Sequence, residues 1–210
     1  MSRAALVVVD IQNDFVHPSG KVGKGNGDVA PLLAAVDAIN RLIIAARRAT
    51  APIVYVHVTH SPAVDTAAYR ARYVKRGMSV DDLLCAEGSW GAEFYDGLEQ
   101  PESDDLIVTK HGYDAFAVSD LTARLNELGV DTIIVTGVVT ELCVLGTASG
   151  GFERGFHVIV PREATSSVDH IAAEAALKLV ADFYGSVVSL EEGIAAVGHQ
   201  DVESTLGQQA

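Results

Sequence analysis

The segment ALVVVD at residues 5–10 decides the fold class of this chain. Five apolar residues, three of them β-branched, run without alternation and end at an acid. Such a run is typical of a parallel strand that is covered by helices on both faces. Further runs of this kind follow along the chain at Ile53–Val58, Leu106–Thr109, Thr132–Thr136, His157–Val160 and Ser186–Ser189.

Segments with helical patterns separate these runs. Asp28–Arg48 carries apolar residues near helical spacing and ends in two arginines, which suit the C-terminus of a helix. Val118–Leu128, Thr140–Arg154 and Asp169–Tyr184 are each followed by a glycine, which is a frequent C-capping residue. Repeated strand–helix–strand units predict a right-handed, doubly wound α/β sheet of about six parallel strands.

The composition limits the class of protein. The 210 residues are 49% hydrophobic, and 15 Lys and Arg against 28 Asp and Glu give a net charge of −13. We expect one domain over residues 1–210 that buries its core without disulfides, since there are only two cysteines. The charge disfavours nucleic acid and anionic membranes as partners. Because no signal-peptide pattern or membrane-spanning run is found, we expect a cytoplasmic protein.

The stretch from Thr59 to Glu102 differs from the rest of the chain, because it carries only weak helix signals over more than forty residues. Loops of this length tend to be functional lids or interface elements, and the sequence leaves both open. Within it, Tyr69–Arg76 (YRARYVKR) is the one basic patch. We interpret this patch as a solvated face, and a cover over an anionic substrate is the alternative.

Three polar residues stand where ligands bind in such a sheet, beyond the carboxyl ends of the strands. Asp10 and Lys110 each end a predicted strand, and Cys143 follows a third one at the start of a helix. A carboxylate at the end of a buried strand needs a partner, a metal or a catalytic task, unless it caps a helix or a loop. Lys110 is either a fixed cation near a developing negative charge or an ordinary snorkelling lysine.

Cys143 is the strongest candidate of the three for a catalytic residue. With Thr140 as the expected N-cap, it lies in the first turn of a helix, where the helix dipole lowers a thiol pKa. Free backbone N–H groups there can also bind an oxyanion. The alternative is a buried structural cysteine, which is our interpretation of Cys85. A thiol, an acid and an ammonium together suggest nucleophilic acyl transfer, although spacing in the chain does not show that they meet.

Other patterns favour no further function. The segment Gly20–Gly27 contains neither a G-x-G-x-x-G nor a G-x-x-x-x-G-K-[ST] motif, so nucleotide binding is disfavoured. In GTASG at residues 146–150 the serine has the wrong place for a nucleophile elbow. A strand end would not aim both His57 and His60 at one metal. We expect His57 to be buried and His60 to lie at the rim of the sheet. We expect no metal and no other cofactor.

Four motifs in the chain together resemble the isochorismatase-like cysteine hydrolase superfamily, which includes nicotinamidases, N-carbamoylsarcosine amidases and ureidoacrylate amidohydrolases. They are VVVDIQNDF (7–15), GSWGAEF (88–94), TKHGYDAF (109–116) and TGVVTELCV (136–144). The resemblance spans the chain from Ala5 to about Ser189. It implies a Rossmann-like three-layer α/β/α sandwich and a catalytic triad of Asp10, Lys110 and Cys143.

The resemblance implies three further features. One is a cis peptide bond between Val138 and Val139, which aims the N–H of Val139, together with that of Cys143, into an oxyanion hole. Another is a homodimer or homotetramer. The third is a set of substrate-lining residues, for which the candidates are Phe15, Trp90, Glu93, Tyr113 and Phe116.

Two departures from family patterns narrow the expected reaction. Residues 58–69, VTHSPAVDTAAY, follow the strand predicted at Ile53–Val58, and they lack the metal motif that nicotinamidases carry at this place. Isochorismatases cleave a vinyl ether and have no cysteine at the position of Cys143. We therefore expect a cysteine-dependent amidohydrolase that cleaves a C–N amide bond of a small ureido, N-carbamoyl or simple amide substrate through a thioester, releasing ammonia or an amine. The alternatives are a vinyl-ether hydrolase that uses Asp10 without the thiol, and a non-catalytic binding protein on the same scaffold.

Overall fold

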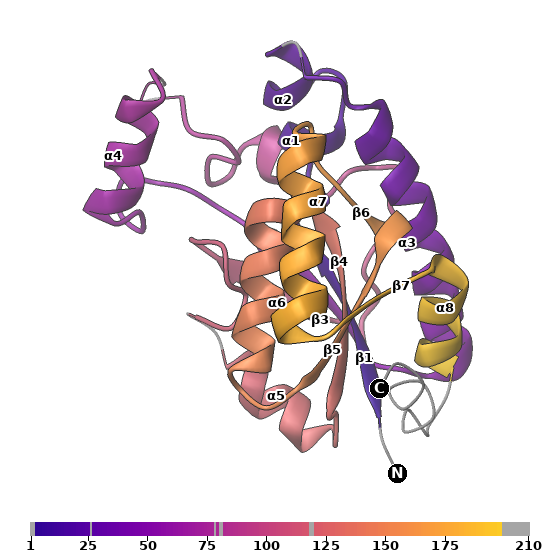
Figure 1. Cartoon of the computed structure of the whole chain (residues 1–210). Helices are drawn as coiled ribbons and strands as arrows, with labels where there is room; N and C mark the ends of the chain where they lie inside the picture. Colours follow the sequence, from indigo (N-terminus) through magenta and orange to yellow (C-terminus); the bar gives the residue numbers. More distant parts are fainter. Residues whose placement is uncertain (1–2, 26, 78, 80–81, 118–119, 199–210) are drawn as a thin grey trace.

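The computed structural model describes residues 3–25, 27–77, 79, 82–117 and 120–198. A parallel sheet in the strand order β3-β2-β1-β4-β5-β7 forms its centre, and β6 also pairs with β4 (Figure 1). The strands are β1 (Ala4–Val9), β2 (Ile53–Val58), β3 (Leu106–Lys110), β4 (Thr132–Val138), β5 (His157–Pro161), β6 (Thr165–Ser166) and β7 (Ser186–Val188). The six strands predicted from the apolar runs are confirmed, and β6 is an addition.

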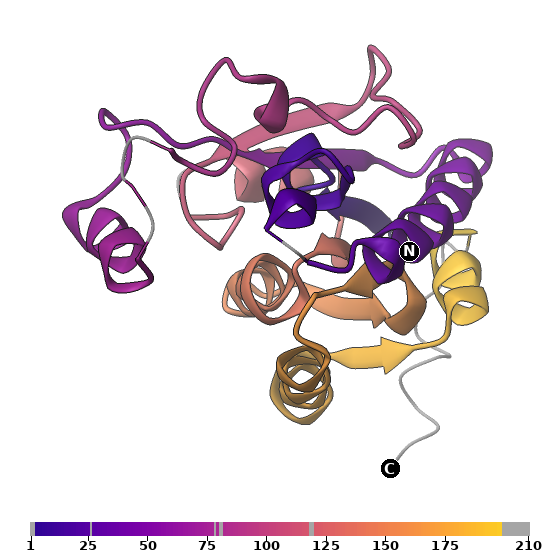
Figure 2. The same ribbon diagram turned by 90° about the horizontal axis from the view of Figure 1, so that it is seen from above.

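Helices cover both faces of this sheet (Figures 1 and 2). The longer ones that flank the sheet are α3 (Ala30–Ala49), α5 (Leu121–Glu127), α6 (Leu145–Phe152), α7 (His170–Leu179) and α8 (Leu190–Gly198), and a further helix, α4 (Ala67–Lys75), lies apart from them. The single-turn helices α1 (Asn13–Val16) and α2 (Lys21–Lys24) follow β1. Two π-helical turns, Thr140–Val144 and Val180–Tyr184, adjoin α6 and α7, and short 3₁₀ turns lie at Trp90–Ala92 and Arg162–Ala164.

Side-chain alternation in β1 shows how the two layers of the core arise. Leu6 and Val8 pack into the cluster that contains the apolar residues of α3 and α8. Val7 and Val9 point to the other face, where they join the apolar residues of α5, α6 and α7. Because both faces of the strand are covered, an uninterrupted apolar run is what this position requires. The three-layer α/β/α sandwich is thereby confirmed.

The helix predictions differ from the structure mainly at the helix ends. The helix predicted for Val118–Leu128 begins at Leu121, and residues 118 and 119 lie outside the described residues. Thr140 is not an N-cap, because its hydroxyl is hydrogen-bonded to that of Thr165 at 2.8 Å and Val139 precedes the helical turn. The segment after β4 thus begins as a π-helical turn that continues into α6.

The described part of the long stretch from Thr59 to Glu102 contains α4 and the 3₁₀ turn Trp90–Ala92. Helix α4 lies away from the helices that flank the sheet in both views (Figures 1 and 2). Its first turn is capped by Thr66, whose hydroxyl accepts a hydrogen bond from the backbone N–H of Tyr69. Among the described residues, no helix is long and apolar enough to cross a membrane.

Candidate active site

The strand order places Asp10 and Cys143 side by side. From β1 the chain builds outward through β2 to β3, and it then returns to place β4 on the other side of β1. Such a reversal opens a crevice at the carboxyl ends of the two central strands. Asp10 directly follows β1, and Cys143 lies in the helical turn that follows β4. Lys110 ends β3, two strands away from β1.

The three predicted residues are in contact. The Lys110 ammonium donates a hydrogen bond of 2.7 Å to Oδ2 of Asp10 and one of 2.9 Å to the carbonyl oxygen of Gly112. Its Nζ also lies 3.2 Å from Sγ of Cys143. The side chains of Asp10 and Lys110 are 0% exposed and Cys143 is 6% exposed. The long lysine side chain therefore bridges the distance between β3 and the β1–β4 crevice inside the protein.

The backbone around the crevice is tightly constrained. Asp10 has a φ of 57°, in the left-handed region that Asp tolerates better than most residues. On the neighbouring strand, Gly137 pairs with Val9 and has a φ of 121°, and a Cβ atom there would lie 2.0 Å from the carbonyl oxygen of Val9. Only glycine permits this approach of β4 to β1. The next peptide bond but one, between Val138 and Val139, is cis, at the position where the family resemblance places it.

The electrostatics of the site favour a protonated thiol. Burial, and then the negative charge of Asp10, raise the pKa of Cys143 above its ordinary value, and the Lys110 ammonium only partly opposes this. For Lys110, burial lowers the pKa, but Asp10 and Cys143 outweigh burial and the net pKa is raised. The expectation of a thiol pKa lowered by the helix dipole is therefore wrong. A protonated thiol needs a neighbouring base before it can act as a nucleophile.

A cavity of about 410 Å³ opens at this edge of the sheet, and Cys143 forms part of its wall. Of the residues expected in the site, Phe15, Tyr113 and Val139 also line this cavity. Sequence reasoning missed much of the rest of the wall, which includes His60, Tyr69, Tyr73, Leu84, Leu142 and Ser167. The basic segment Tyr69–Arg76 was the one signal for part of it, because this segment provides four of the lining residues.

Three residues expected to contact substrate do not line this cavity. Phe116 is buried on the α5–α6 face of the sheet, where its ring stacks on Phe156 at 5.7 Å. Trp90 is 46% exposed and its ring contacts that of His17. Glu93 is exposed. These expectations are not supported by the structure, because the family motifs contain residues that build the fold as well as residues that face the cavity.

His57, within β2, and His60, just after it, are placed in the reverse of the expected way. His60 is buried and His57 is half-buried. Nδ1 of His60 is 2.7 Å from Oδ1 of Asp65, and its Nε2 is 3.0 Å from the hydroxyl of Tyr69. Nε2 of His57 is 2.7 Å from the hydroxyl of Thr109. In the described part of the chain, no group of three or more His, Cys, Asp or Glu side chains could hold a metal ion.

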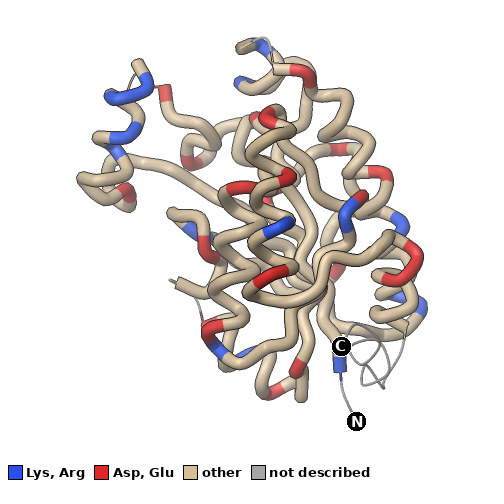
Figure 3. The backbone as a smooth tube through the Cα atoms, viewed as in Figure 1, with Lys and Arg blue, Asp and Glu red and all other residues tan. Residues whose placement is uncertain are grey.

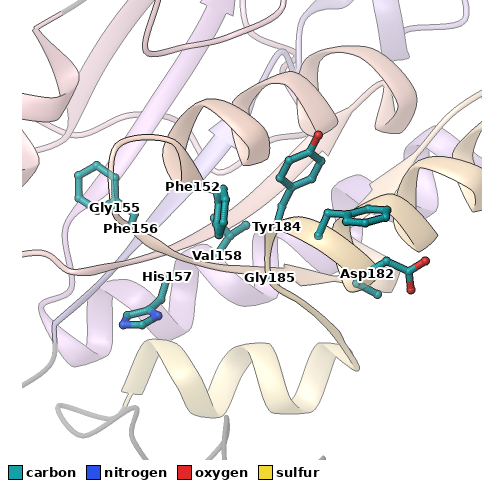
Figure 4. A pocket seen from close by; sticks show the side chains of 10 residues that line it. Phe152, Gly155, Phe156, His157, Val158, Asp182, Tyr184 and Gly185 are labelled. Atoms are coloured by element: carbon teal, nitrogen blue, oxygen red, sulfur yellow. The ribbon is translucent and has the colours of Figure 1, made fainter.

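A second cavity, of about 430 Å³, lies between α6, β5 and the π-helical turn Val180–Tyr184 (Figure 4). Aromatic side chains dominate its wall, including Phe152, Phe156 and Tyr184. Its lining contains none of Asp10, Lys110 and Cys143. The chemistry-bearing residues therefore belong to the cavity at the carboxyl edge of the sheet.

A parallel α/β/α sandwich with a buried acid, ammonium and thiol at its strand-order reversal defines a Rossmann-like protein with a hydrolase-type site. The chain belongs to the isochorismatase family, because the family model described as the isochorismatase domain matches residues 4–192.

A similar sequence and two similar crystal structures support this assignment. The ureidoacrylate amidohydrolase RutB of Methylobacterium radiotolerans is 29% identical over 204 residues, covering 92% of this chain and 79% of that protein. The crystal structure of a cysteine hydrolase from Pseudomonas syringae pv. phaseolicola is similar with a TM-score of 0.82 and 29% identity, covering 95% and 94% of the two chains. The N-carbamoylsarcosine amidase of Thermoplasma acidophilum gives a TM-score of 0.71 and 25% identity, covering 90% and 97%.

Proposed function

We propose that this hydrolase cleaves the C–N bond of a small ureido, N-carbamoyl or simple amide substrate, with Cys143 as the nucleophile. The observation that carries the proposal is the contact of Lys110 with both Asp10 and the Cys143 thiol, where that thiol lines a cavity. Two of the similar proteins are named as amidases or amidohydrolases, which supports an amide as the substrate.

The first half of the reaction forms a thioester. Asp10 takes the proton of Cys143 as the sulfur attacks the carbonyl carbon, so the buried thiol is deprotonated only when the substrate is in place. The Lys110 ammonium stabilises the negative charge on Asp10 and on the sulfur of Cys143 during this proton transfer. The oxygen of the tetrahedral intermediate lies between the backbone N–H groups of Val139 and Cys143. Asp10 then gives the proton to the departing nitrogen, and ammonia or an amine leaves.

The second half hydrolyses the thioester. Asp10, again a carboxylate, takes a proton from a water molecule that attacks the thioester carbonyl. The tetrahedral oxygen occupies the same two backbone N–H groups, and the carbon–sulfur bond breaks. The proton returns from Asp10 to the sulfur of Cys143. The site is then in its starting state, and no group outside the chain is consumed except water.

Ammonia release from a panel of amides tests the proposal. We expect turnover of at least one of 3-ureidopropionate, N-carbamoylglycine, propylurea, nicotinamide and propionamide, with loss of that activity after treatment with iodoacetamide. Cys85→Ala provides a matched control, because Cys85 is buried and does not line the cavity. Its activity should respond to iodoacetamide as the wild type does.

Two results would contradict the proposal. Activity on a vinyl ether that survives thiol blocking would indicate an ether hydrolase that uses Asp10 alone. A folded, reduced protein that releases no ammonia from the panel and carries no reactive thiol near neutral pH would indicate a binding protein.

A further inference from the structure

The wall of the Cys143 cavity is cationic although the chain as a whole is strongly acidic. Among the described residues, Lys21, Arg72 and Arg76 line the cavity, and Glu141 carries the one carboxylate in that part of the wall. The net charge of the whole chain is −13. Arg72 lies on α4 and Arg76 directly follows it, and Lys and Arg residues are gathered in this part of the chain (Figure 3). A local positive region in an acidic protein concentrates anions at that place.

Arg72 is the cation that is best prepared to bind an anion. Its guanidinium lies over the rings of Tyr69, Tyr73 and Tyr113, at 4.6, 5.1 and 5.7 Å from their centroids. No side-chain hydrogen bond or ion pair of Arg72 is found within the described part of the chain, and its Nε is buried without a partner there. The rings hold the guanidinium plane, so its donors are orientated before a ligand arrives.

The neighbouring cations are differently engaged. The ammonium of Lys21 donates to Oδ1 of Asp82 at 2.6 Å and also to a backbone carbonyl. Arg70, on the same helix as Arg72, donates to the carbonyl oxygens of Pro62 and Asp65. Arg70 therefore fastens the start of α4 to the preceding loop, whereas Arg72 is left to face the cavity.

Helix α4 is fastened to the site through His60. Asp65 accepts from Nδ1 of His60, so Nε2 is the acceptor for the hydroxyl of Tyr69. The Tyr69 ring also stacks on the imidazole at a centroid distance of 4.5 Å. This arrangement fixes the α4 residue whose ring lies nearest to the Arg72 guanidinium. The same helix turn thus sets the position of the cation relative to the cavity.

A short path also connects Arg72 to the catalytic residues. Lys110 donates to the carbonyl oxygen of Gly112, and the next residue, Tyr113, is one of the three rings under the guanidinium. The cavity volume of about 410 Å³ falls in the range of roughly 300–1,000 Å³ that holds small ligands. A small molecule can therefore meet the thiol and the guanidinium in one cavity.

We propose that the substrate is an amide that carries a carboxylate, and that Arg72 on α4 binds this carboxylate while Cys143 attacks the amide carbonyl. This inference rests on the proposed function and narrows it, because it prefers ureido and N-carbamoyl acids over neutral amides. Arg72 is then the residue that determines specificity, through a charge-assisted pair with two parallel hydrogen bonds.

A matched pair of substrates tests this assignment. 3-Ureidopropionate and propylurea share the ureido group and the three-carbon chain and differ in the carboxylate. We expect the wild type to prefer the acid in kcat/KM. Arg72→Gln should reduce that preference about 10- to 100-fold, mainly through a higher KM for the acid, since a hydrogen bond to a charged group contributes about 1.5–3 kcal/mol. Arg72→Lys, which keeps the charge without the planar donors, should retain part of the preference.

Lys75→Gln is the control, because it removes the same charge from the same helix at a residue that does not line the cavity. It should leave the preference within about twofold of the wild type. The assignment is overturned if the wild type does not prefer the acid, or if Arg72→Gln leaves the preference unchanged. It is also overturned if Arg72→Gln lowers kcat/KM equally for both ureas. If the wild type releases ammonia from no amide of the panel, the proposed function fails, and this inference fails with it.

Discussion

At the scale of single residues, the site is a set of three groups that control one another's protons. Lys110 keeps its charge because Asp10 and Cys143 offset the effect of burial on its pKa. Cys143 keeps its proton because burial and Asp10 raise its pKa. A thiol of this kind reacts more slowly than a free thiolate, and it becomes a strong nucleophile through transfer of its proton to a neighbouring base. Because of this coupling, one substitution can raise the alkylation rate of Cys143 and lower the rate of substrate hydrolysis.

Asp10→Asn is expected to change these two properties in opposite directions. Removal of the carboxylate charge lowers the pKa of Cys143 while Lys110 still stabilises a thiolate, so alkylation of Cys143 by iodoacetamide near pH 7 should become several-fold faster. Hydrolysis should fall about 10²- to 10⁴-fold, because the acid–base group is lost. Mass spectrometry of the Cys143 peptide over time measures the first rate, and ammonia release measures the second. Slower alkylation together with lower turnover would contradict the assigned charge effect.

At the scale of elements, the fold was predictable where one pattern is repeated over a long stretch. Apolar runs marked the strands because both sheet faces are buried, and α3 was marked by its apolar spacing. Helix α4 was not predicted, because its nine residues bury only Tyr73 and its sequence is basic and weakly amphipathic. For the same reason, the part of the cavity wall that α4 forms could not be predicted from the sequence.

The approach of β4 to β1 can be tested at Gly137. Gly137→Ala places a methyl group within 2.0 Å of the Val9 carbonyl oxygen, so β4 must shift and the free energy of unfolding should fall by several kcal/mol. Gly155→Ala is the control, since Gly155 also has a positive φ but a Cβ there meets no atom within 4 Å. It should cost about 1–2 kcal/mol, the penalty of left-handed backbone alone.

Urea unfolding followed by circular dichroism compares the two variants. The shift of β4 in Gly137→Ala should also displace the segment that leads to Cys143 and reduce ammonia release. Equal costs for the two substitutions would mean that the close contact between β4 and β1 does not support the site.

At the scale of the whole molecule, the strand order brings together residues that are distant in the sequence. No local sequence pattern predicts this order. Asp10 and Cys143 were predicted to share an edge because parallel strands end on one side. The sequence did not reveal that β3 is two strands from β1, so that only the length and burial of the Lys110 side chain complete the group. Net charge was equally uninformative about the site, because the cavity wall is cationic in an acidic chain.

His57 and His60 are expected to make the stability of the fold depend on pH. Burial lowers the pKa values of His57 and His60 below the ordinary value of 6.5. Below pH 6.5 the unfolded chain therefore binds more protons than the folded chain, and the free energy of unfolding should decrease as the pH falls through this window. The double variant with His57→Gln and His60→Gln should show a shallower decrease between pH 6.5 and 5.5.

Urea midpoints at several pH values measure this dependence. His157→Gln, at an exposed position, controls for the loss of an imidazole elsewhere. An unchanged slope in the double variant would show that other groups cause the acid sensitivity.

Comparison of Cys143→Ala with Cys85→Ala tests the central claim most directly. Both substitutions remove one buried thiol, but only Cys143 contacts Lys110 and lines the cavity. The measurement is ammonia release from the amide that the wild type hydrolyses best. We predict that Cys143→Ala, folded as judged by circular dichroism, releases no ammonia above the uncatalysed rate, whereas Cys85→Ala retains turnover. Ordinary turnover by a folded Cys143→Ala variant would contradict the assignment of Cys143 as the nucleophile.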